Sequence, residues 1–468
     1  MAPRRFPWLF ALLLCGCRTF TPAAHPIKAP PDELSQLQGA QTRTFELATA
    51  LCDASGPRFS GSPGEAAGVT WAVTTMKALG LSNVHTEAVT VPRWVRGREE
   101  ARVLAPLDVP LAVVGLGHST PTPESGVEGE VSEVTSIDQL KAVAPQSLTG
   151  KILFVNVPMR RTIDGAGYGE VAMIRRLAGQ QAFVGGAVAA LIRSVGTDQT
   201  RLAHTGSQGP DPAKVPSGAL SVPDAELVHR LLAKGPVRLK LTLLSREEAP
   251  VESANVVGEV PGRENPEQVV VLGAHLDSWD LGTGAVDDAA GVAAVMDAAR
   301  LLLTLPRVPR RTVRVVLFTN EENGLGGARA YAKAHEGELA QHVVAMESDF
   351  GTERVRAVRL LASDTARATF QGWGPWFAPL EVAVDADGAE GGADVSPLRA
   401  AGVPVMDARQ DGTRYFDLHH TANDTADKLD PTQLPQLTRT IASLAWLAAE
   451  LQVDFGRLAP AQRERPKR

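Results

Sequence analysis

Cysteine and aromatic residues are scarce in this 468-residue chain, which has three cysteines and 5% aromatic residues. Cys15 and Cys17 fall in a leader-like segment, so the body has one thiol, Cys52, and we expect no internal disulfide. The chain also lacks a basic block longer than a few residues and has a formal net charge of −6, which argues against nucleic acid as a partner. Beyond the leader, no apolar run reaches the ~18 residues that a membrane-spanning helix needs.

The first 17 residues are typical of a signal for export. Two arginines give a charged start, and residues 8–14 form an apolar stretch before a run of small residues. Leu-Cys-Gly-Cys at 14–17 resembles a bacterial lipobox with Cys17 as the lipidated residue, and signal cleavage without a lipid is the alternative. We therefore expect a lipoprotein on the periplasmic or outer-membrane face, held to the membrane only by its lipid anchor, or a secreted protein if Cys17 is not lipidated.

The body divides by pattern into an interrupted catalytic domain and an insert. Residues 97–250 contain recurrent short strand-like runs with two helical patterns between them, which predicts a separate β-rich inserted domain. The catalytic domain then has two parts, 35–96 and 251–456. Residues 18–34 are rich in Pro and Ala and predict a flexible tether, and 457–468 predict a disordered tail.

The second catalytic part alternates strand and helix patterns. Residues 269–274 and 313–319 are continuous apolar runs, as expected for strands buried on both faces. A strong helix pattern follows the first run, at 288–305, and a long closing helix is predicted at 431–453. This order predicts an α/β fold with a mostly parallel-centred sheet and helices on both faces.

Six residues with metal-binding or proton-transfer chemistry fall at or near the ends of these elements. They are His275, Asp287, Glu321, Glu322, Asp349 and His420. In open α/β sheets, ligands bind just beyond the carboxyl ends of the strands, so we expect all six at one rim. Imidazole and carboxylate together suit zinc, and this number of ligands suffices for two ions.

The chemistry of the side chains suggests how two Zn²⁺ would be shared. His275 and Asp349 would hold one ion, and Glu322 and His420 the other. Asp287 would bridge the ions, because a carboxylate has two oxygens to offer. Two such ions lower the pKa of a shared water toward ~7.

The remaining glutamate and a nearby aspartate have supporting roles in this hypothesis. Glu321 would stay off the metals, take a proton from the water and pass it to the leaving amine. A metal-bound imidazole usually gives its second N–H to a carboxylate, and Asp277, two residues beyond His275, is the expected acceptor.

Each of these residues also has an ordinary structural explanation. A histidine that ends a buried strand can be structural, Asp287 and Asp288 can cap a helix, and Glu321 and Glu322 can favour a helix dipole. Their joint occurrence at predicted strand ends favours a metal site.

At these residues the sequence resembles the co-catalytic zinc aminopeptidases and carboxypeptidases, above all the plasma glutamate carboxypeptidase group. The likeness runs from about residue 45 to about 455. The matching segments are 56–62, 190–194, 204–206, 273–280, 284–288, 319–322, 346–349, 388–391 and 419–425.

The resemblance implies a phosphorylase/hydrolase-like zinc exopeptidase fold, an insert like a protease-associated domain and the ligands and base named above. It also implies a cis peptide bond between Asp287 and Asp288. Ala289 and Ala290 stand where the family often has glycines, a departure that concerns the loop and not the ligands. A homodimer is left open by the resemblance.

We therefore expect an exported di-zinc metallo-exopeptidase that hydrolyses dipeptides or short peptides through a metal-activated water. The alternatives are a receptor-like homologue without catalysis and a single-zinc acyltransferase like glutaminyl cyclase. Trp279, Glu390, Tyr415 and His419 flank the ligand segments and are candidate substrate-binding residues, and Tyr415 and His419 are both candidates to stabilise an oxyanion. Aminopeptidase, dipeptidase and carboxypeptidase modes all stay open, as does side-chain preference.

Overall fold

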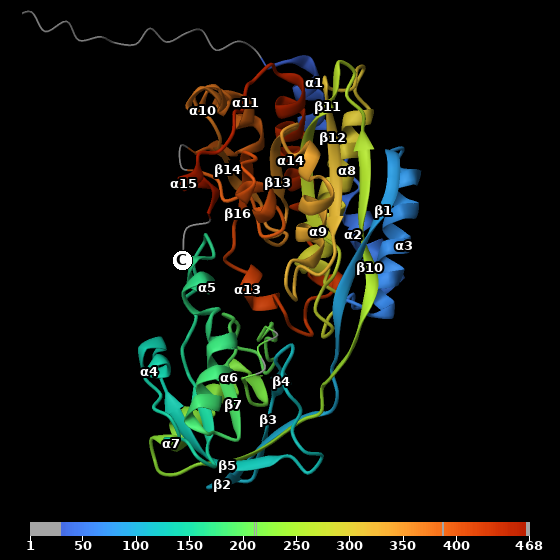
Figure 1. The fold of residues 1–468 in the computed structure, drawn as a ribbon. Helices are drawn as coiled ribbons and strands as arrows, with labels where there is room; N and C mark the ends of the chain where they lie inside the picture. The colour runs from blue at the N-terminus through green and yellow to red at the C-terminus, as the bar shows by residue number, and fades with distance from the viewer. Residues whose placement is uncertain (1–29, 210, 212, 386–387, 465–468) are drawn as a thin grey trace, which may run out of the picture.

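The computed structural model describes residues 30–464 except 210, 212 and 386–387. The predicted signal peptide and Cys17 lie outside the described residues, as do residues 18–29 of the predicted tether. Two lobes are visible in Figure 1, each built around an eight-stranded sheet. Within the described part of the chain, no helix is long and apolar enough to cross a membrane.

The larger lobe contains a mixed sheet with a parallel centre. Its strands are, in spatial order, β1 (Ser82–Val95), β10 (Arg246–Val260), β12 (Arg311–Phe318), β11 (Asn265–His275), β13 (His342–Glu347), β16 (Val405–Gln410), β14 (Val355–Leu361) and β15 (Ala383–Val384). The central strands β12, β11, β13 and β16 run parallel. At the edges, β10 pairs antiparallel with β1 and β12, and β14 pairs antiparallel with β16 and parallel with β15. The predicted α/β class with a parallel-centred sheet is confirmed.

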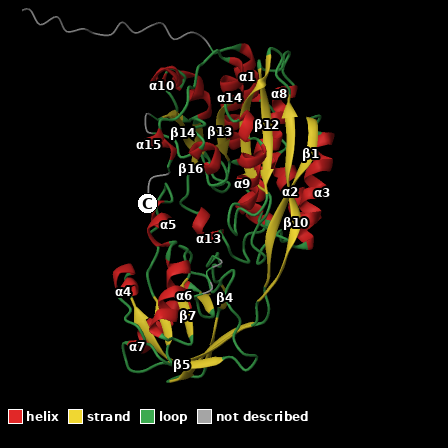
Figure 2. Ribbon diagram, in the orientation of Figure 1, coloured by secondary structure: helices red, strands yellow, loops and turns green. Residues whose placement is uncertain are grey.

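Helices cover both faces of this sheet (Figure 2). One face carries α1 (Asp32–Gly39), α2 (Thr44–Ser55), α3 (Pro63–Ala78), α8 (Ala290–Leu303) and α14 (Leu434–Glu450), and the other carries α9 (Gly326–Ala334) and α12 (Ser396–Ala400). In β11, Val270 and Leu272 point into the first core and Val269 and Val271 into the second. Burial on both faces explains why this strand is a continuous apolar run.

The smaller lobe is formed by residues between β1 and β10. Its strands are, in spatial order, β3 (Val109–Leu111), β2 (Glu99–Ala105), β9 (Arg238–Leu243), β5 (Val127–Val134), β6 (Ile152–Val155), β7 (Ala189–Arg193), β8 (Ser217–Leu220) and β4 (Val113–Gly115). Helices α4 (Ile137–Lys141) and α6 (Ile174–Gly185) pack on one face and α7 (Val222–Leu232) on the other. The likeness of this lobe to a protease-associated domain stays a prediction.

The two lobes are joined by the long antiparallel pair β1 and β10, which runs from the large sheet toward the smaller lobe (Figure 1). Short helices near the junction are α5 (Ala166–Val171) in the smaller lobe and α13 (Tyr415–Leu418) in the larger. The larger lobe also contains α10 (Asp364–Gln371), α11 (Gly374–Phe377) and α15 (Pro460–Arg463).

Both ends of the described chain are more ordered than the sequence predicted. Helix α1 begins at Asp32 and Leu34 is fully buried, so the tether does not extend to residue 34. Leu458 is also buried, and Arg457 donates hydrogen bonds to two backbone carbonyl oxygens of the larger lobe. The predicted disordered tail is therefore wrong over residues 457–464, because isolated leucines in polar segments give no periodic signal along the chain.

Candidate metal centre and substrate pocket

The six predicted residues lie at one rim of the large sheet. His275 ends β11, Glu321 and Glu322 follow β12, and Asp349 follows β13. These three strands are neighbours and run parallel, so their carboxyl ends meet. Asp287 precedes α8 and His420 follows α13, and both segments reach the same rim.

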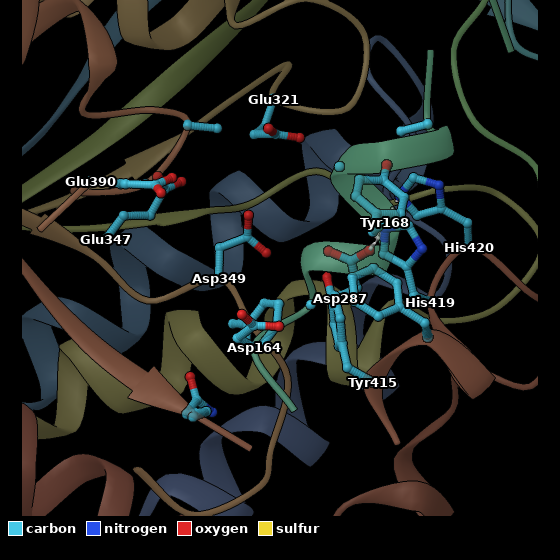
Figure 3. Close-up of a pocket in the computed structure, with 18 of the residues that line it drawn as sticks. Asp164, Tyr168, Asp287, Glu321, Glu347, Asp349, Glu390, Tyr415, His419 and His420 are labelled. Atoms are coloured by element: carbon cyan, nitrogen blue, oxygen red, sulfur yellow. Dashed lines mark ion pairs between the residues drawn. The ribbon is translucent and has the colours of Figure 1, made fainter. Parts of the chain in front are cut away.

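Asp287 lies at the centre of the cluster, with each carboxylate oxygen facing a different imidazole. Its Oδ1 is 3.1 Å from His275 Nε2, and its Oδ2 is 3.4 Å from His420 Nε2. Asp349 Oδ1 is 3.5 Å from His275 Nε2, and Glu322 Oε2 is 2.9 Å from His420 Nε2. Figure 3 shows Asp287 between Asp349 on one side and the two adjacent histidines on the other. The five side chains thus form two groups that share Asp287.

The donor set fits metal ions. Asp287 Oδ2 and Glu322 Oε1 are buried and have no hydrogen-bond partner among the described residues. Burial raises the pKa of Asp287 and of Glu322, and the charges of neighbouring carboxylates raise both further. A buried carboxylate without a partner is costly, and a divalent cation would offset that cost while using the same oxygens as ligands.

The adjacent histidines His419 and His420 stack with a ring separation of 3.5 Å. Burial lowers the pKa of both well below the ordinary range, so both are neutral, which is the form that binds metal. His419 Nε2 lies 3.7 Å from Asp287 Oδ2, and ligand atoms of Asp287, His419 and His420 lie within 4.8 Å of one another. His419, predicted as a substrate-binding residue, therefore also lies within reach of the metal centre.

Asp424 fixes the backbone around the central aspartate. Its Oδ1 accepts a hydrogen bond from Val286 N at 2.6 Å and its Oδ2 one from Asp287 N at 3.2 Å. The peptide bond between Asp287 and Asp288 is cis, as the family resemblance implies. Sequence reasoning did not assign a role to Asp424, although it lies in the matching segment 419–425.

Arg58 ties the loop after β11 to the loop before α8. The fully buried guanidinium donates to the carbonyl oxygens of Leu276, Thr283 and Gly284 at 2.6–2.9 Å. Sequence reasoning assigned no role to Arg58, although it lies in the segment 56–62 that matches the family.

The carboxylate of Asp277 is not the hydrogen-bond partner of His275 that the sequence predicted. His275 Nδ1 is 2.9 Å from the backbone carbonyl oxygen of Asp277 and 3.9 Å from its carboxylate. The carboxylate instead accepts hydrogen bonds from the backbone N–H groups of Glu321 and Glu322, at 2.9 and 3.3 Å, and from Ser60 Oγ at 2.9 Å. It turns away because the start of the next ligand segment offers two backbone donors there.

A cavity of about 600 Å³ opens beside the cluster, between the two lobes. Tyr168, Arg175 and Ser207 contribute to its wall from the smaller lobe. The larger lobe contributes the metal-centre carboxylates and three of the four predicted substrate-binding residues, Glu390, Tyr415 and His419. Figure 3 shows Glu347 and Glu390 close together, on the opposite side of the site from Tyr168.

Trp279 does not line this cavity, so its prediction as a substrate-binding residue is not supported there. Its ring lies 5.5 Å from that of His420 and 4.9 Å from that of Phe59. It packs in a small aromatic cluster with Phe59 and Trp94, and from there its ring packs near the imidazole of His420.

The smaller lobe holds the loop that carries the adjacent histidines. His204 Nδ1 is 2.8 Å from His419 O, and the backbone N–H of Thr205 donates to His420 O at 3.0 Å. His204 Nε2 is in turn 2.7 Å from Asp198 Oδ1. Sequence reasoning treated the insert as a separate domain and did not place it in the site, although residues 204–206 are one of the matching segments.

Comparison with known proteins agrees with this geometry. Residues 255–445 match the model of peptidase family M28. Carboxypeptidase Q from Bos taurus is 34% identical over 418 residues, which are 88% of this chain and 86% of the relative. Carboxypeptidase Q from Homo sapiens is 34% identical over 416 residues, with the same coverage.

Solved structures are similar over most of the chain. The structure of a peptidase M28 precursor from Shewanella amazonensis has a TM-score of 0.89 and 40% identity, and covers 92% of this chain and 97% of its own. A zinc aminopeptidase from Bacillus subtilis has a TM-score of 0.65 at 18% identity, covering 89% of this chain and 98% of its own, which shows a shared fold.

Proposed function

The chain belongs to peptidase family M28 and is a zinc metallopeptidase, and from this premise we propose that it is a di-zinc exopeptidase that hydrolyses dipeptides or short peptides. The observation that carries the proposal is the position of Asp287, whose two oxygens face His275 and His420 separately. Such an arrangement favours two ions over one, and therefore a hydrolase over a single-zinc acyltransferase. Export through the leader and lipidation of Cys17 stay predictions from the sequence.

The residues that would hold the two ions lie on either side of Asp287. His275 and Asp349 belong to one side, and Glu322 and His420 to the other. Bound zinc pairs supply Lewis-acid polarisation of a carbonyl and lower the pKa of a water toward ~7.

Glu321 is the proposed proton carrier. It lines the cavity, and within the described residues its carboxylate makes no ion pair like those that join Asp349 to His275 and Glu322 to His420, so it is available for proton transfer. Burial raises the pKa of Glu321 well above the ordinary range, and the charge of Asp349 raises it further. A raised pKa brings the carboxylate closer to what a general base at neutral pH requires. Glu321 would take the proton of the attacking water and give it to the leaving amine.

The backbone of Glu321 is fixed independently of its side chain. Asp277 Oδ1 accepts the hydrogen bond of the Glu321 N–H, so a change at the carboxylate leaves the main chain in place. This arrangement makes Glu321→Gln a clean test of the base.

The experiment combines metal analysis with a substrate panel. Purified protein should contain two zinc ions per chain, lose activity with a chelator and regain it with zinc. Glu321→Gln should keep its zinc and lose roughly 10²–10⁴-fold in kcat, because it removes only the proton carrier. Glu336→Gln, at an exposed position of the same lobe, is the matched control and should retain wild-type kcat. Native turnover in Glu321→Gln would refute the assigned base.

A panel of dipeptides, aminoacyl amides and blocked peptides then separates the three exopeptidase modes. Hydrolysis of both dipeptides and aminoacyl amides supports an aminopeptidase, hydrolysis of dipeptides alone supports a dipeptidase, and cleavage of amino-blocked peptides supports a carboxypeptidase. A zinc-loaded protein that hydrolyses none of them would contradict the proposed function.

A further inference from the structure

Arg175, near the start of α6 in the smaller lobe, is a buried cation whose hydrogen-bonding capacity is largely unused. The residue is 4% exposed. Its Nη1 donates to Tyr168 Oη at 2.7 Å, but its Nε and Nη2 have no hydrogen-bond partner among the described residues. Arginine is rarely this buried unless it is paired with an anion. Among the residues that the structure describes, no carboxylate forms an ion pair with Arg175.

The guanidinium is held in place from two sides. The ring of Tyr168 lies 5.3 Å from the guanidinium carbon. On another side, the backbone of Gly206, with φ +144°, approaches so closely that a Cβ there would lie 2.4 Å from Arg175 Nε. A glycine at this position lets the guanidinium pack against the main chain. The group is thus pre-organised, which lowers the entropic cost of binding a ligand.

Arg175 also lies beside the metal centre, on the wall of the cavity. The ring of Tyr168 is 5.1 Å from that of His419, which stacks on His420. Burial is the main cause of the lowered pKa of both histidines, and the positive charge of Arg175 lowers both further. A group bound by Arg175 would therefore lie within a short distance of the reacting bond.

The rest of the cavity wall shows where an anion would be accepted. Glu347, Glu390 and Asp407 line it, so a negatively charged group is repelled from that part. A second arginine of the wall, Arg409, is already 4.0 Å from the carboxylate of Asp407. Arg175 is thus the buried cation of this wall, and its Nε and Nη2 have no hydrogen-bond partner within the described part of the chain.

We propose that Arg175, together with Tyr168, binds the free carboxylate of a short peptide substrate. The inference rests on the proposed exopeptidase function and names its substrate class, which is peptides whose carboxyl terminus lies close to the scissile bond, with dipeptides foremost. A guanidinium fits a carboxylate through parallel N–H donors. The Tyr168 hydroxyl accepts from Arg175, so its own proton is available as a further donor.

The test compares substrates that differ only in this carboxylate. Ala-Leu and Ala-Leu-amide share the scissile bond and the free amine, so kcat/KM for the acid over the amide isolates recognition of the charge. Wild-type protein should prefer the acid by about 10- to 100-fold, the range of a charge-assisted hydrogen bond. Arg175→Met should lose about that factor on the acid, mainly through KM, and change little on the amide. Arg175→Lys should recover part of the preference, and Tyr168→Phe should lose a few-fold on the acid.

The matched control is Arg193→Met, in the same lobe, where Arg193 pairs with Glu226 outside this cavity. It should keep the wild-type acid-to-amide ratio. Inhibition by leucine and by leucinamide provides a second measurement that needs no variant. Leucine should inhibit the wild-type protein about 10-fold or more better, because only leucine carries the carboxylate.

The outcomes separate the two proposals. If the zinc-loaded wild-type protein hydrolyses neither substrate nor any other peptide of the panel above, the exopeptidase function is refuted. If it hydrolyses both with equal efficiency and leucine is no better than leucinamide, the function stands and the carboxylate site is overturned. An equal loss on acid and amide in a folded Arg175→Met protein also overturns the site, since it indicates a structural role.

Discussion

Replacement of Asp277 by Asn tests whether this buried carboxylate fixes the segment that carries Glu321 and Glu322. The side chain is fully buried and accepts three hydrogen bonds. An asparagine that keeps its oxygen toward Glu321 N presents an NH₂ group to the backbone N–H of Glu322. One buried donor then loses its acceptor and faces another donor.

The expected cost follows from that count. Leaving one buried N–H unsatisfied costs about 1–3 kcal/mol in the free energy of unfolding. Because Glu321 and Glu322 both move with this segment, we also expect about a 10²-fold loss of kcat from misplacement of the reacting groups. Unfolding by denaturant measures the loss of stability. The kcat of the folded, zinc-loaded protein measures the loss of turnover.

Ser60→Ala is the matched comparison for Asp277→Asn. It removes the third hydrogen bond to the same carboxylate and the one that Ser60 Oγ accepts from Asn320 Nδ2, but leaves both backbone N–H groups held by Asp277. We expect a stability loss of about 0.5–1.5 kcal/mol with most of the turnover retained. An Asp277→Asn protein with wild-type kcat would refute the reasoning, and so would an equal loss of kcat in Ser60→Ala.

Two further predictions concern stability away from the metal centre. Burial lowers the pKa of His342 to about 4 from 6.5, and its Nε2 is 2.9 Å from Tyr331 Oη. The unfolded state therefore binds the proton more readily, so stability is full above pH ~6.5 and falls by up to about 3 kcal/mol as the pH drops to 4. His342→Gln should remove that part of the pH dependence of urea unfolding, and an unchanged profile would contradict the assignment. Phe154→Ala, at a fully buried position of β6, should cost about 3–5 kcal/mol while the folded protein keeps kcat within about twofold, and a loss under 1 kcal/mol would contradict tight packing there.

The metal-centre residues were predictable because the ends of parallel strands meet in space. The apolar runs before His275 and Glu321 marked the strands, and polar side chains directly after them marked the rim. Asp287 and His420 were harder, since they lie before and between helices, and there the family resemblance supported their assignment. The structure brings all these side chains together.

Other expectations were wrong or incomplete because the distance between two residues along the sequence does not determine the direction in which their side chains point. Asp277 lies two residues beyond His275, yet its carboxylate turns to the backbone of the next segment. Trp279 follows His275 closely in the sequence, yet its ring packs near His420 and does not line the cavity. In both places, contacts between segments far apart in the sequence decide where the side chain points.

The sequence by itself determined the α/β core and placed the proposed metal ligands and the proposed base at or near the strand ends, because period, strand ends and side-chain chemistry are local properties. Only the tertiary structure decided that Asp287 offers one oxygen to each histidine and that the smaller lobe contributes Tyr168 and Arg175 to the cavity. The β1–β10 pair brings that lobe to the rim of the large sheet, and no pattern along the chain encodes how closely residues 175 and 420 approach after folding.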